Sequence, residues 1–213
     1  SSTTSPLLGS LITASQRTLA DLAATGRFRE DLRFRLEVIQ VPVPPLRAAV
    51  PGSGVTPPQP APALPLTDTT LRRSSLTALL QGQTTLVQLM FTGCGTVCPA
   101  QGLLFATLAG RARPQPARWL SISIDTLGDD PTRLRAWQAR FGLHPSWLAA
   151  VPDTADVDRL SEFLRGGPVK AGTHGTQVFV FDAQARLVHR TADNPSAPEL
   201  EALIRRHSGG DSA

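Results

Sequence analysis

The clearest pattern in the chain is a short apolar run, LVQLMF, that begins at Leu86 and ends at Phe91. A run of this length predicts a buried strand, and Thr92 and Gly93 mark the point where regular pairing should stop. We expect a helix to follow and to run to about Arg111. The residues expected on its buried face are Leu103, Leu104, Ala106 and Leu108.

The same kind of pattern predicts elements on both sides of this junction. Before it, a short strand or loop is expected from Leu64 to Asp68, and a helical turn from Ser75 to Leu80. After it, we expect a strand from Arg118 to Asp125, a helix from Asp130 to about Phe141, a short helix from Asp156 to Leu164, a central strand at VFVF from Val178, a turn from Asp182 to Ala185, a return strand from Arg186 to Arg190, and a closing helix from Ser196 or Ala197 to about Arg206.

The only two cysteines, Cys94 and Cys98, lie on either side of the expected helix start. Residues four apart in a helix project from one face, about one turn apart. Unpaired amides and the positive end of the helix dipole favour thiolate over thiol, so we expect both sulfurs to be reactive. Their Cα atoms would lie roughly 6 Å apart, within the range that a disulfide tolerates. The pair therefore predicts either a soft-metal site or a disulfide.

A β-α-β unit followed by a β-β-α unit, with cysteines at the first strand-to-helix junction, is the layout of a thioredoxin-like domain. We therefore expect the α/β fold class, a thioredoxin-like three-layer α/β/α sandwich with an N-terminal extension. In that layout the loop before Val178 lies against the cysteine junction, because the two neighbouring strands run antiparallel. This loop contains His174.

Two thiolates and the imidazole of His174 form a compact, soft, three-coordinate set that suits Cu(I). Cu(II) would require a further oxygen or nitrogen ligand, which water or Asp125 would supply. A lone loop histidine is usually bonded to backbone, and only its place opposite the cysteine pair favours a ligand role. Three other histidines are expected to be surface or half-buried residues without a ligand role: His144, His189 and His207.

Two further residue types near the junction have simpler explanations than metal binding. Asp129 and Asp130, with Asp125, would form an acidic rim at the end of the sheet, but capping of the helix that starts at Asp130 is the commoner role of such residues. Met90, the only methionine, is expected to point into the core.

Proline content predicts the division of the chain. Nine of the nineteen prolines lie between Pro42 and Pro65, which is typical of an extended linker without a core of its own. We therefore expect an N-terminal helix-plus-strand extension at residues 1–41, a linker at 42–65, the thioredoxin-like domain at 66–207 and a flexible tail at 208–213.

Composition and charge limit the partners. The net charge is only +4, and all basic residues except Lys170 are arginines scattered along the chain, so nucleic-acid binding is not predicted. No apolar segment approaches the roughly 18 residues that a membrane span needs, and the first residues lack the charged start of a signal peptide. We expect any membrane contact to come through an anchor that is absent from this chain. Two cysteines alone do not fix the redox compartment.

Three segments resemble the SCO/SenC family of copper-binding assembly factors for cytochrome c oxidase: FTGCGTVCP, SISIDTLGDDPTRL and THGTQVFVFDAQARLV. The resemblance covers roughly Pro62 to His207. It implies copper binding through Cys94, Cys98 and His174 and help in building the binuclear copper centre of the oxidase. The implied partners are a cytochrome c oxidase subunit as copper acceptor and a donor copper chaperone.

The resemblance also implies a place for the protein in the cell. The protein is expected in the periplasm or at the outer face of the bacterial inner membrane, anchored by an N-terminal segment that has been removed. This chain departs from many members in carrying Gly95 and Thr96, where they have a proline and an acidic residue.

Two other functions remain open on the same residues. A thiol-disulfide oxidoreductase would use one of Cys94 and Cys98 to attack a partner disulfide and the other to resolve it, with His174 tuning the thiolate. The spacing argues against this function, because three residues lie between the cysteines, whereas thioredoxin-like redox enzymes have two. A peroxidase-like or sensory protein ranks last, because it needs only one low-pKa sulfur and its activator.

Overall fold

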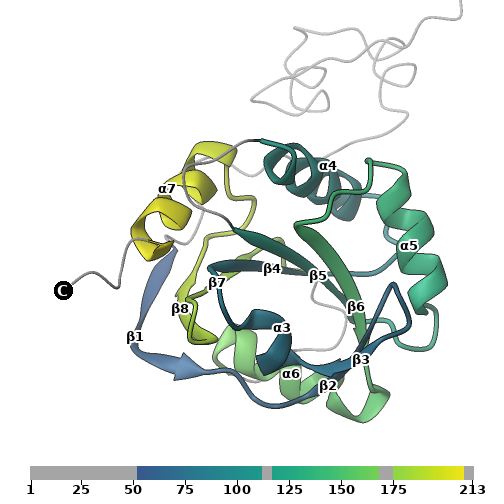
Figure 1. The fold of residues 1–213 in the computed structure, drawn as a ribbon, viewed down its shortest axis with the longest axis horizontal. Coiled ribbons are helices and arrows are strands. Elements are labelled where there is room, and N and C mark those ends of the chain that lie inside the picture. Colours follow the sequence, from purple (N-terminus) through teal and green to yellow (C-terminus); the bar gives the residue numbers. More distant parts are fainter. Residues whose placement is uncertain (1–51, 112–116, 168–174, 209–213) are drawn as a thin grey trace, which may run out of the picture. The chain divides into compact units, whose positions relative to one another are not determined.

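The computed structural model describes residues 52–111, 117–167 and 175–208. These residues form one eight-stranded mixed sheet of order β1-β8-β7-β4-β5-β6-β2-β3 with helices on both faces (Figure 1). The strands are β1 (Ser53–Pro60), β2 (Pro65–Asp68), β3 (Arg73–Ser75), β4 (Thr85–Met90), β5 (Arg118–Ser123), β6 (Trp147–Pro152), β7 (Val178–Phe181) and β8 (Arg186–Arg190). The helices are α3 (Leu76–Leu80), α4 (Val97–Ala109), α5 (Pro131–Ala139), α6 (Val157–Arg165) and α7 (Ala197–Ser208), with a 3₁₀ turn, η2 (Thr154–Asp156), before α6.

Two hydrophobic cores lie on opposite faces of the sheet. Leu86 and Met90 of β4 belong to the core beneath α4, α5 and α7, whereas Val87 and Leu89 belong to the core beneath α3 and α6. This division follows from the alternation of side chains along a strand. The expected three-layer α/β/α sandwich is confirmed, and Met90 is buried as predicted. The predicted N-terminal extension and C-terminal tail lie outside the described residues, apart from Ser208, which ends α7.

The central strand β4 has one parallel and one antiparallel neighbour. It pairs parallel with β5 along its whole length, and antiparallel with β7, where Gln88 lies opposite Val178. The end of β4 and the start of β7 therefore meet at the same edge of the sheet, as the sequence predicted. This edge is where α4 begins.

The predicted elements from β4 onward are confirmed in type, with boundaries that differ by a few residues. The helical turn after Ser75 is also confirmed, because the Ser75 side chain accepts a hydrogen bond from the Ala78 N–H and caps α3. The pattern gave no indication of β3 or β6. Strand β6, WLAAVP, is buried at nearly every position, but its two alanines and its terminal proline weaken the apolar signal of a strand.

The prediction of a linker without its own core is wrong for Ser53–Pro60. These residues form β1, which pairs antiparallel with β8 at one edge of the sheet, from Ser53 opposite Arg190 to Pro60 opposite Arg186. Only Val55 of this strand is buried. An edge strand tolerates prolines because one side of its backbone needs no partner in the sheet, so proline content alone did not exclude it.

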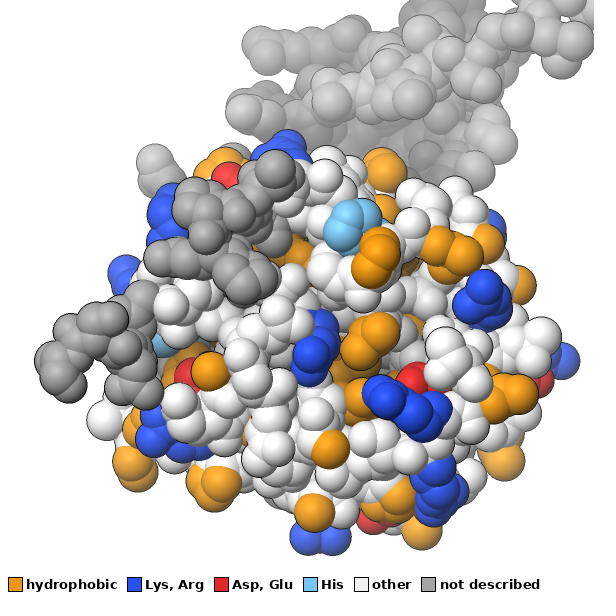
Figure 2. Space-filling view, in the orientation of Figure 1, with side chains coloured by type: hydrophobic (Ala, Val, Ile, Leu, Met, Phe, Trp, Pro, Cys, Tyr) orange, Lys and Arg blue, Asp and Glu red, His pale blue; other side chains and the backbone are white. Residues whose placement is uncertain are grey.

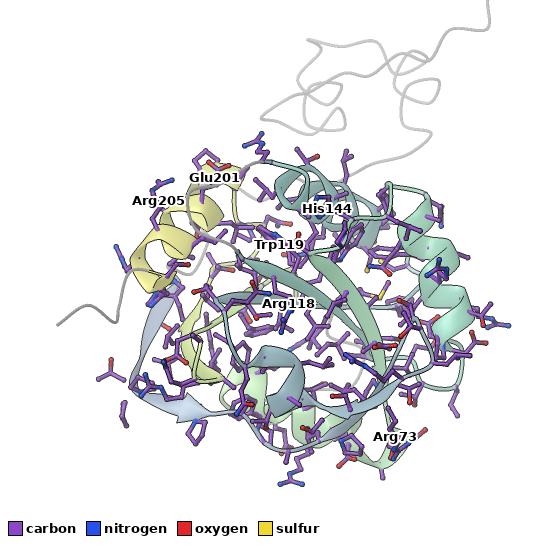
Figure 3. The ribbon with its side chains drawn as sticks, viewed as in Figure 1. Arg73, Arg118, Trp119, His144, Glu201 and Arg205 are labelled. Atoms are coloured by element: carbon purple, nitrogen blue, oxygen red, sulfur yellow. The ribbon has the colours of Figure 1, made fainter. Side chains whose placement is uncertain are left out.

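Helix α4 buries Leu108 as predicted, and Leu104 and Ala106 are partly buried against the core, but the prediction is wrong for Leu103. Leu103 is 59% exposed, while its buried residues include Cys98, Gln101, Gly102, Phe105 and Leu108. The Phe105 ring packs edge-on against Trp119 of β5, which Figure 3 labels, with ring centroids 4.9 Å apart. At the other end, Arg111 forms an ion pair of 2.7 Å with Glu201 of α7, also labelled in Figure 3. The first contact holds α4 on the sheet, and the second joins the chain just after α4 to α7.

Basic side chains do not gather into one patch on the face seen in Figure 2. Lys and Arg side chains lie apart there, with apolar and uncharged surface between them. Among the helices that the structure describes, none combines the length and apolarity that a bilayer span requires.

Gly102 lets α4 approach α5 closely, and we predict that Gly102→Ala destabilises the fold. A Cβ at this position would lie 2.8 Å from Phe141 and 2.9 Å from Trp137. Overpacking typically costs about 1 to 3 kcal/mol. It would outweigh the gain of about 1 kcal/mol in helix propensity. Urea unfolding should show a net loss, whereas Thr107→Ala on the exposed face of α4 should be neutral or stabilising. An unchanged midpoint for Gly102→Ala would contradict this packing.

Candidate metal centre

The two cysteines lie on either side of the start of α4. Cys94 belongs to the loop after β4, where its N–H donates to the Phe91 carbonyl at 3.2 Å, and Cys98 lies in the first helical turn. Thr96 occupies the N-cap position without a side-chain capping bond. Its hydroxyl lies 3.7 Å from the Cys94 sulfur instead. The expected position of the pair at a strand-to-helix junction is confirmed.

Both cysteines are free thiols buried at the edge of the core. Cys94 is 8% exposed and Cys98 is 3% exposed, and both belong to the hydrophobic core beneath α4. The two thiols are near enough that each shifts the pKa of the other. This arrangement offers two soft donors to one ion, or two thiols to one disulfide.

Hydrogen bonds favour the thiolate of Cys94. Burial by itself would raise its pKa, but bonds from the Cys98 thiol, from the Cys98 and Thr96 N–H groups and from the Thr96 hydroxyl lower the pKa from 9.0 to about 7. No charged residue occurs in the sequence between Arg73 and Arg111. Among the described residues, the groups that lower the pKa of Cys94 are neutral hydrogen-bond donors at the helix start.

Cys98 behaves in the opposite way. Its deeper burial and its hydrogen bond to Cys94 raise its pKa from 9.0 to about 12. The prediction that both sulfurs are reactive is therefore wrong for Cys98 in the metal-free protein. Sequence spacing places both cysteines near the helix dipole, but it does not reveal that one sulfur lies deeper than the other.

A buried carboxylate holds the cysteine loop to the next strand. Asp129 accepts hydrogen bonds from the Thr92 N–H at 2.9 Å, from the Thr92 hydroxyl, and from the Ser123 hydroxyl at 2.7 Å. The predicted capping role belongs to Asp130 alone, which accepts from the Arg133 N–H at 2.8 Å. Asp129 therefore fixes the residue two places before Cys94. The sequence did not reveal that Asp129 holds this loop, because Asp129 lies next to Asp130, which caps the helix.

A second buried polar contact joins α4 to the segment before β7. The Gln101 side-chain amide donates to the Thr176 carbonyl at 2.6 Å. Thr176 in turn donates from its N–H to Asp193 at 2.7 Å, and from its hydroxyl to the same oxygen at 3.0 Å. Sequence reasoning missed Gln101 and Thr176, because it assigned the buried face of α4 from apolar residues alone.

His174 lies outside the described residues, so its predicted contact with the sulfurs stays a prediction. The Asp125 carboxylate accepts from the Gly128 N–H at 2.9 Å, within its own loop. No group of three or more His, Cys, Asp or Glu side chains forms a metal site among residues 52–111, 117–167 and 175–208. Asp125 is thus not brought together with both cysteines, and its accessory role also stays a prediction.

The other three histidines are half-buried, as expected. His144 contacts the Ser146 hydroxyl at 2.9 Å. Burial lowers the pKa of His189 and of His207.

A central strand with one parallel and one antiparallel neighbour, a cysteine pair where that strand meets a helix, and helices on both faces together define a thioredoxin-like domain. Residues 66–208 match the SCO1/SenC family model. The chain therefore belongs to the SCO1/SenC family, and the resemblance seen in the sequence is confirmed. No curated protein sequence matches the chain.

Solved structures of the same family share this fold. A SCO1/SenC family lipoprotein from Bacillus anthracis is 20% identical with a TM-score of 0.63, over 72% of this chain and 98% of its own. BsSco, described as a member of the Sco family of cytochrome c oxidase assembly proteins, is 18% identical with a TM-score of 0.62, over 74% and 99%. Yeast Sco1 with copper bound is 21% identical with a TM-score of 0.58, over 73% and 91%.

We predict that Cys94 is alkylated at neutral pH and that Cys98 is not. Because hydrogen bonds lower the pKa of Cys94 to about 7, its reaction with iodoacetamide should rise with pH around a midpoint two units below the ordinary value of 9.0. Peptide mapping of the reduced, metal-free protein would measure both sites. Thr96→Val removes one donor and should move the midpoint upward. Equal labelling of both cysteines at pH 7 would contradict the assigned asymmetry.

We predict that Asp129→Ala strongly destabilises the domain, because it leaves two Thr92 donors and one Ser123 donor without their acceptor. The expected loss in unfolding free energy is about 2 to 4 kcal/mol. Asp130→Ala is the matched control, since it removes one exposed capping bond and should cost about 1 kcal/mol. Equal losses in a urea titration of the two variants would refute the special role of Asp129.

Proposed function

We propose that this domain is a copper metallochaperone. Cys94 and Cys98 bind the ion as thiolates, His174 completes a three-coordinate site, and the copper passes by ligand exchange to an acceptor protein. The observation that carries the proposal is the pair of free, buried cysteines on either side of the start of α4, each of which shifts the pKa of the other. Yeast Sco1, which shares the fold, has been solved with copper bound.

The chemistry of the two sulfurs fits a soft ion. Copper, as the cargo, needs thiolate donors, and Cys94 supplies one at neutral pH because its pKa is lowered to about 7. Cys98 holds its proton in the metal-free protein, so its thiolate forms as the ion displaces that proton. Copper uptake should therefore release protons and should weaken as the pH falls.

Two described contacts support His174 as the third ligand. Gln88 lies opposite Val178 in the antiparallel pair, so the segment that leads into β7 approaches the end of the sheet at which α4 begins. The Gln101 amide also binds the carbonyl of Thr176, two residues after His174. A fourth donor for Cu(II) would come from water or Asp125, as the sequence suggested.

The proposed partners follow from the family. The acceptor is a copper-receiving subunit of cytochrome c oxidase, since BsSco is described as belonging to the assembly proteins of that enzyme, and a donor copper chaperone would load the site. The Bacillus anthracis relative is described as a lipoprotein. This supports a place at the outer face of the bacterial inner membrane, on the periplasmic side.

A thiol-disulfide oxidoreductase is the second candidate function. The unequal pKa values favour it, because a reactive Cys94 beside a protonated, deeper Cys98 is the arrangement of an attacking and a resolving thiol. A solved structure of BsSco is described as identifying a disulfide switch in that protein. Copper-independent reduction of a disulfide substrate, lost in both Cys94→Ala and Cys98→Ala, would favour this function over copper delivery.

We predict that the reduced protein binds one equivalent of Cu(I) and that each proposed ligand contributes. Changes outside the ligand set typically cost tenfold to a hundredfold in metal affinity, so Cys94→Ala and Cys98→Ala should each lose more than about a hundredfold. His174→Ala should also weaken binding, whereas His144→Ala, the control, should not. Competition with a chromophoric Cu(I) chelator under anaerobic conditions measures each affinity. Unchanged binding in both cysteine variants would refute the metallochaperone.

A further inference from the structure

We propose that Gln101 is a positioning residue that couples the cysteine helix to the segment carrying the third ligand. The inference rests on the proposed function and extends it to a residue outside the ligand set. Gln101 acts through the backbone of Thr176 and does not touch the copper. Its loss would lower the contribution of His174 to copper affinity and leave the two sulfurs in place.

Gln101 is an unusual residue for its position. It is 6% exposed on the face of α4 that otherwise packs Phe105 and Leu108 into the core. A buried amide is costly unless it is hydrogen-bonded, and its Nε2 donates to the Thr176 carbonyl at 2.6 Å. A leucine or methionine would fill this helix position without such a requirement. The amide therefore contributes directionality, which an apolar side chain cannot supply.

Thr176 is held from two elements at once. Its carbonyl accepts from Gln101 of α4, while its N–H and its hydroxyl both donate to Asp193 in the loop between β8 and α7. The Asn194 N–H donates in turn to the Thr176 hydroxyl at 2.8 Å. Thr176 is also buried. The residue thus forms a fixed point, from which the chain continues back toward His174.

Covalent geometry turns this fixed point into a constraint on the third ligand. Only Gly175 separates Thr176 from His174, so covalent geometry keeps their Cα atoms within about 7 Å of each other. Gln101 follows Cys98 by three residues, which places both side chains on the same face of α4. One helix therefore carries a proposed copper ligand and, one turn later, the contact that limits where the histidine can lie.

The chain offers a matched control for the loss of a buried glutamine bond. Gln138 of α5 is 2% exposed, and its Nε2 donates to the Trp147 carbonyl at 3.1 Å. It is a buried helix glutamine bonded to a strand backbone, but its partner lies in β6. If Gln101 only stabilises the fold, then Gln101→Met and Gln138→Met should have the same consequences for copper binding.

The test is a double-mutant cycle on Cu(I) affinity, measured by chelator competition with Gln101→Met, His174→Ala, the double variant and Gln138→Met. Gln101→Met should weaken binding by about tenfold to a hundredfold, as expected for a group that orients a ligand. The same substitution should have no further effect when His174 is already alanine. Gln138→Met should leave the affinity unchanged, although both methionine variants should lower the melting temperature to a similar degree.

A second readout needs no copper. In the metal-free protein, hydrogen exchange at residues 175–177 should be faster in Gln101→Met than in the natural sequence, and unchanged in Gln138→Met. Suppose that His174→Ala weakens Cu(I) binding. Unchanged hydrogen exchange and unchanged Cu(I) affinity in Gln101→Met would then overturn the inference. If Gln101→Met lowers the Cu(I) affinity equally in the natural sequence and in His174→Ala, the inference is also overturned, because Gln101 would then act on the sulfurs. If His174→Ala has no effect, the three-ligand site itself fails.

Discussion

The antiparallel pairing of β7 with β4 is the constraint on which the site depends. Strand β4 is parallel to β5, so the loops that follow both strands lie at one edge of the sheet, and Asp129 joins them through Thr92 and Ser123. Because β7 runs the other way, the segment that precedes it reaches the same edge. A parallel β7 would have carried that segment to the opposite edge, far from the cysteines.

The reactivity of the cysteine pair arises from depth and hydrogen bonding. The sequence from Ser74 to Gly110 contains no charged residue, so no cation within it stabilises a thiolate. Helix-start N–H groups and the Cys98 thiol lower the pKa of Cys94, and the same hydrogen bond, with deeper burial, raises that of Cys98. At neutral pH the Cys94 sulfur is therefore ionised in a large fraction of the molecules, while the Cys98 sulfur keeps its proton. A soft cation that bound both sulfurs would remove this difference, whereas reaction with a disulfide substrate would make use of it.

Sequence patterns predicted the parts of the fold that local chemistry determines. Apolar runs located β4 and β7, and Asp130 followed by Pro131 located the start of α5. The patterns failed where the environment decides: β1 is proline-rich yet pairs with β8, because it lies at an edge. Helix α4 has apolar residues on all sides, so periodicity could not show that Leu103 faces outward and Gln101 inward. The cysteine pair was evident, but the tertiary contacts of Asp129 and Gln101 were not.

The buried polar residues of this junction explain how an apolar site can still have a defined geometry. Apolar packing is non-directional, and it would let the loop after β4 and the segment before β7 slide against α4. Asp129 and Gln101 each bind backbone groups of one of these two segments, at Thr92 and Thr176. Loss of either hydrogen bond would destabilise the fold, because a buried polar group without a partner has an uncompensated desolvation penalty. That penalty holds the two segments in register with the cysteine helix, and it acts whether or not an ion is bound.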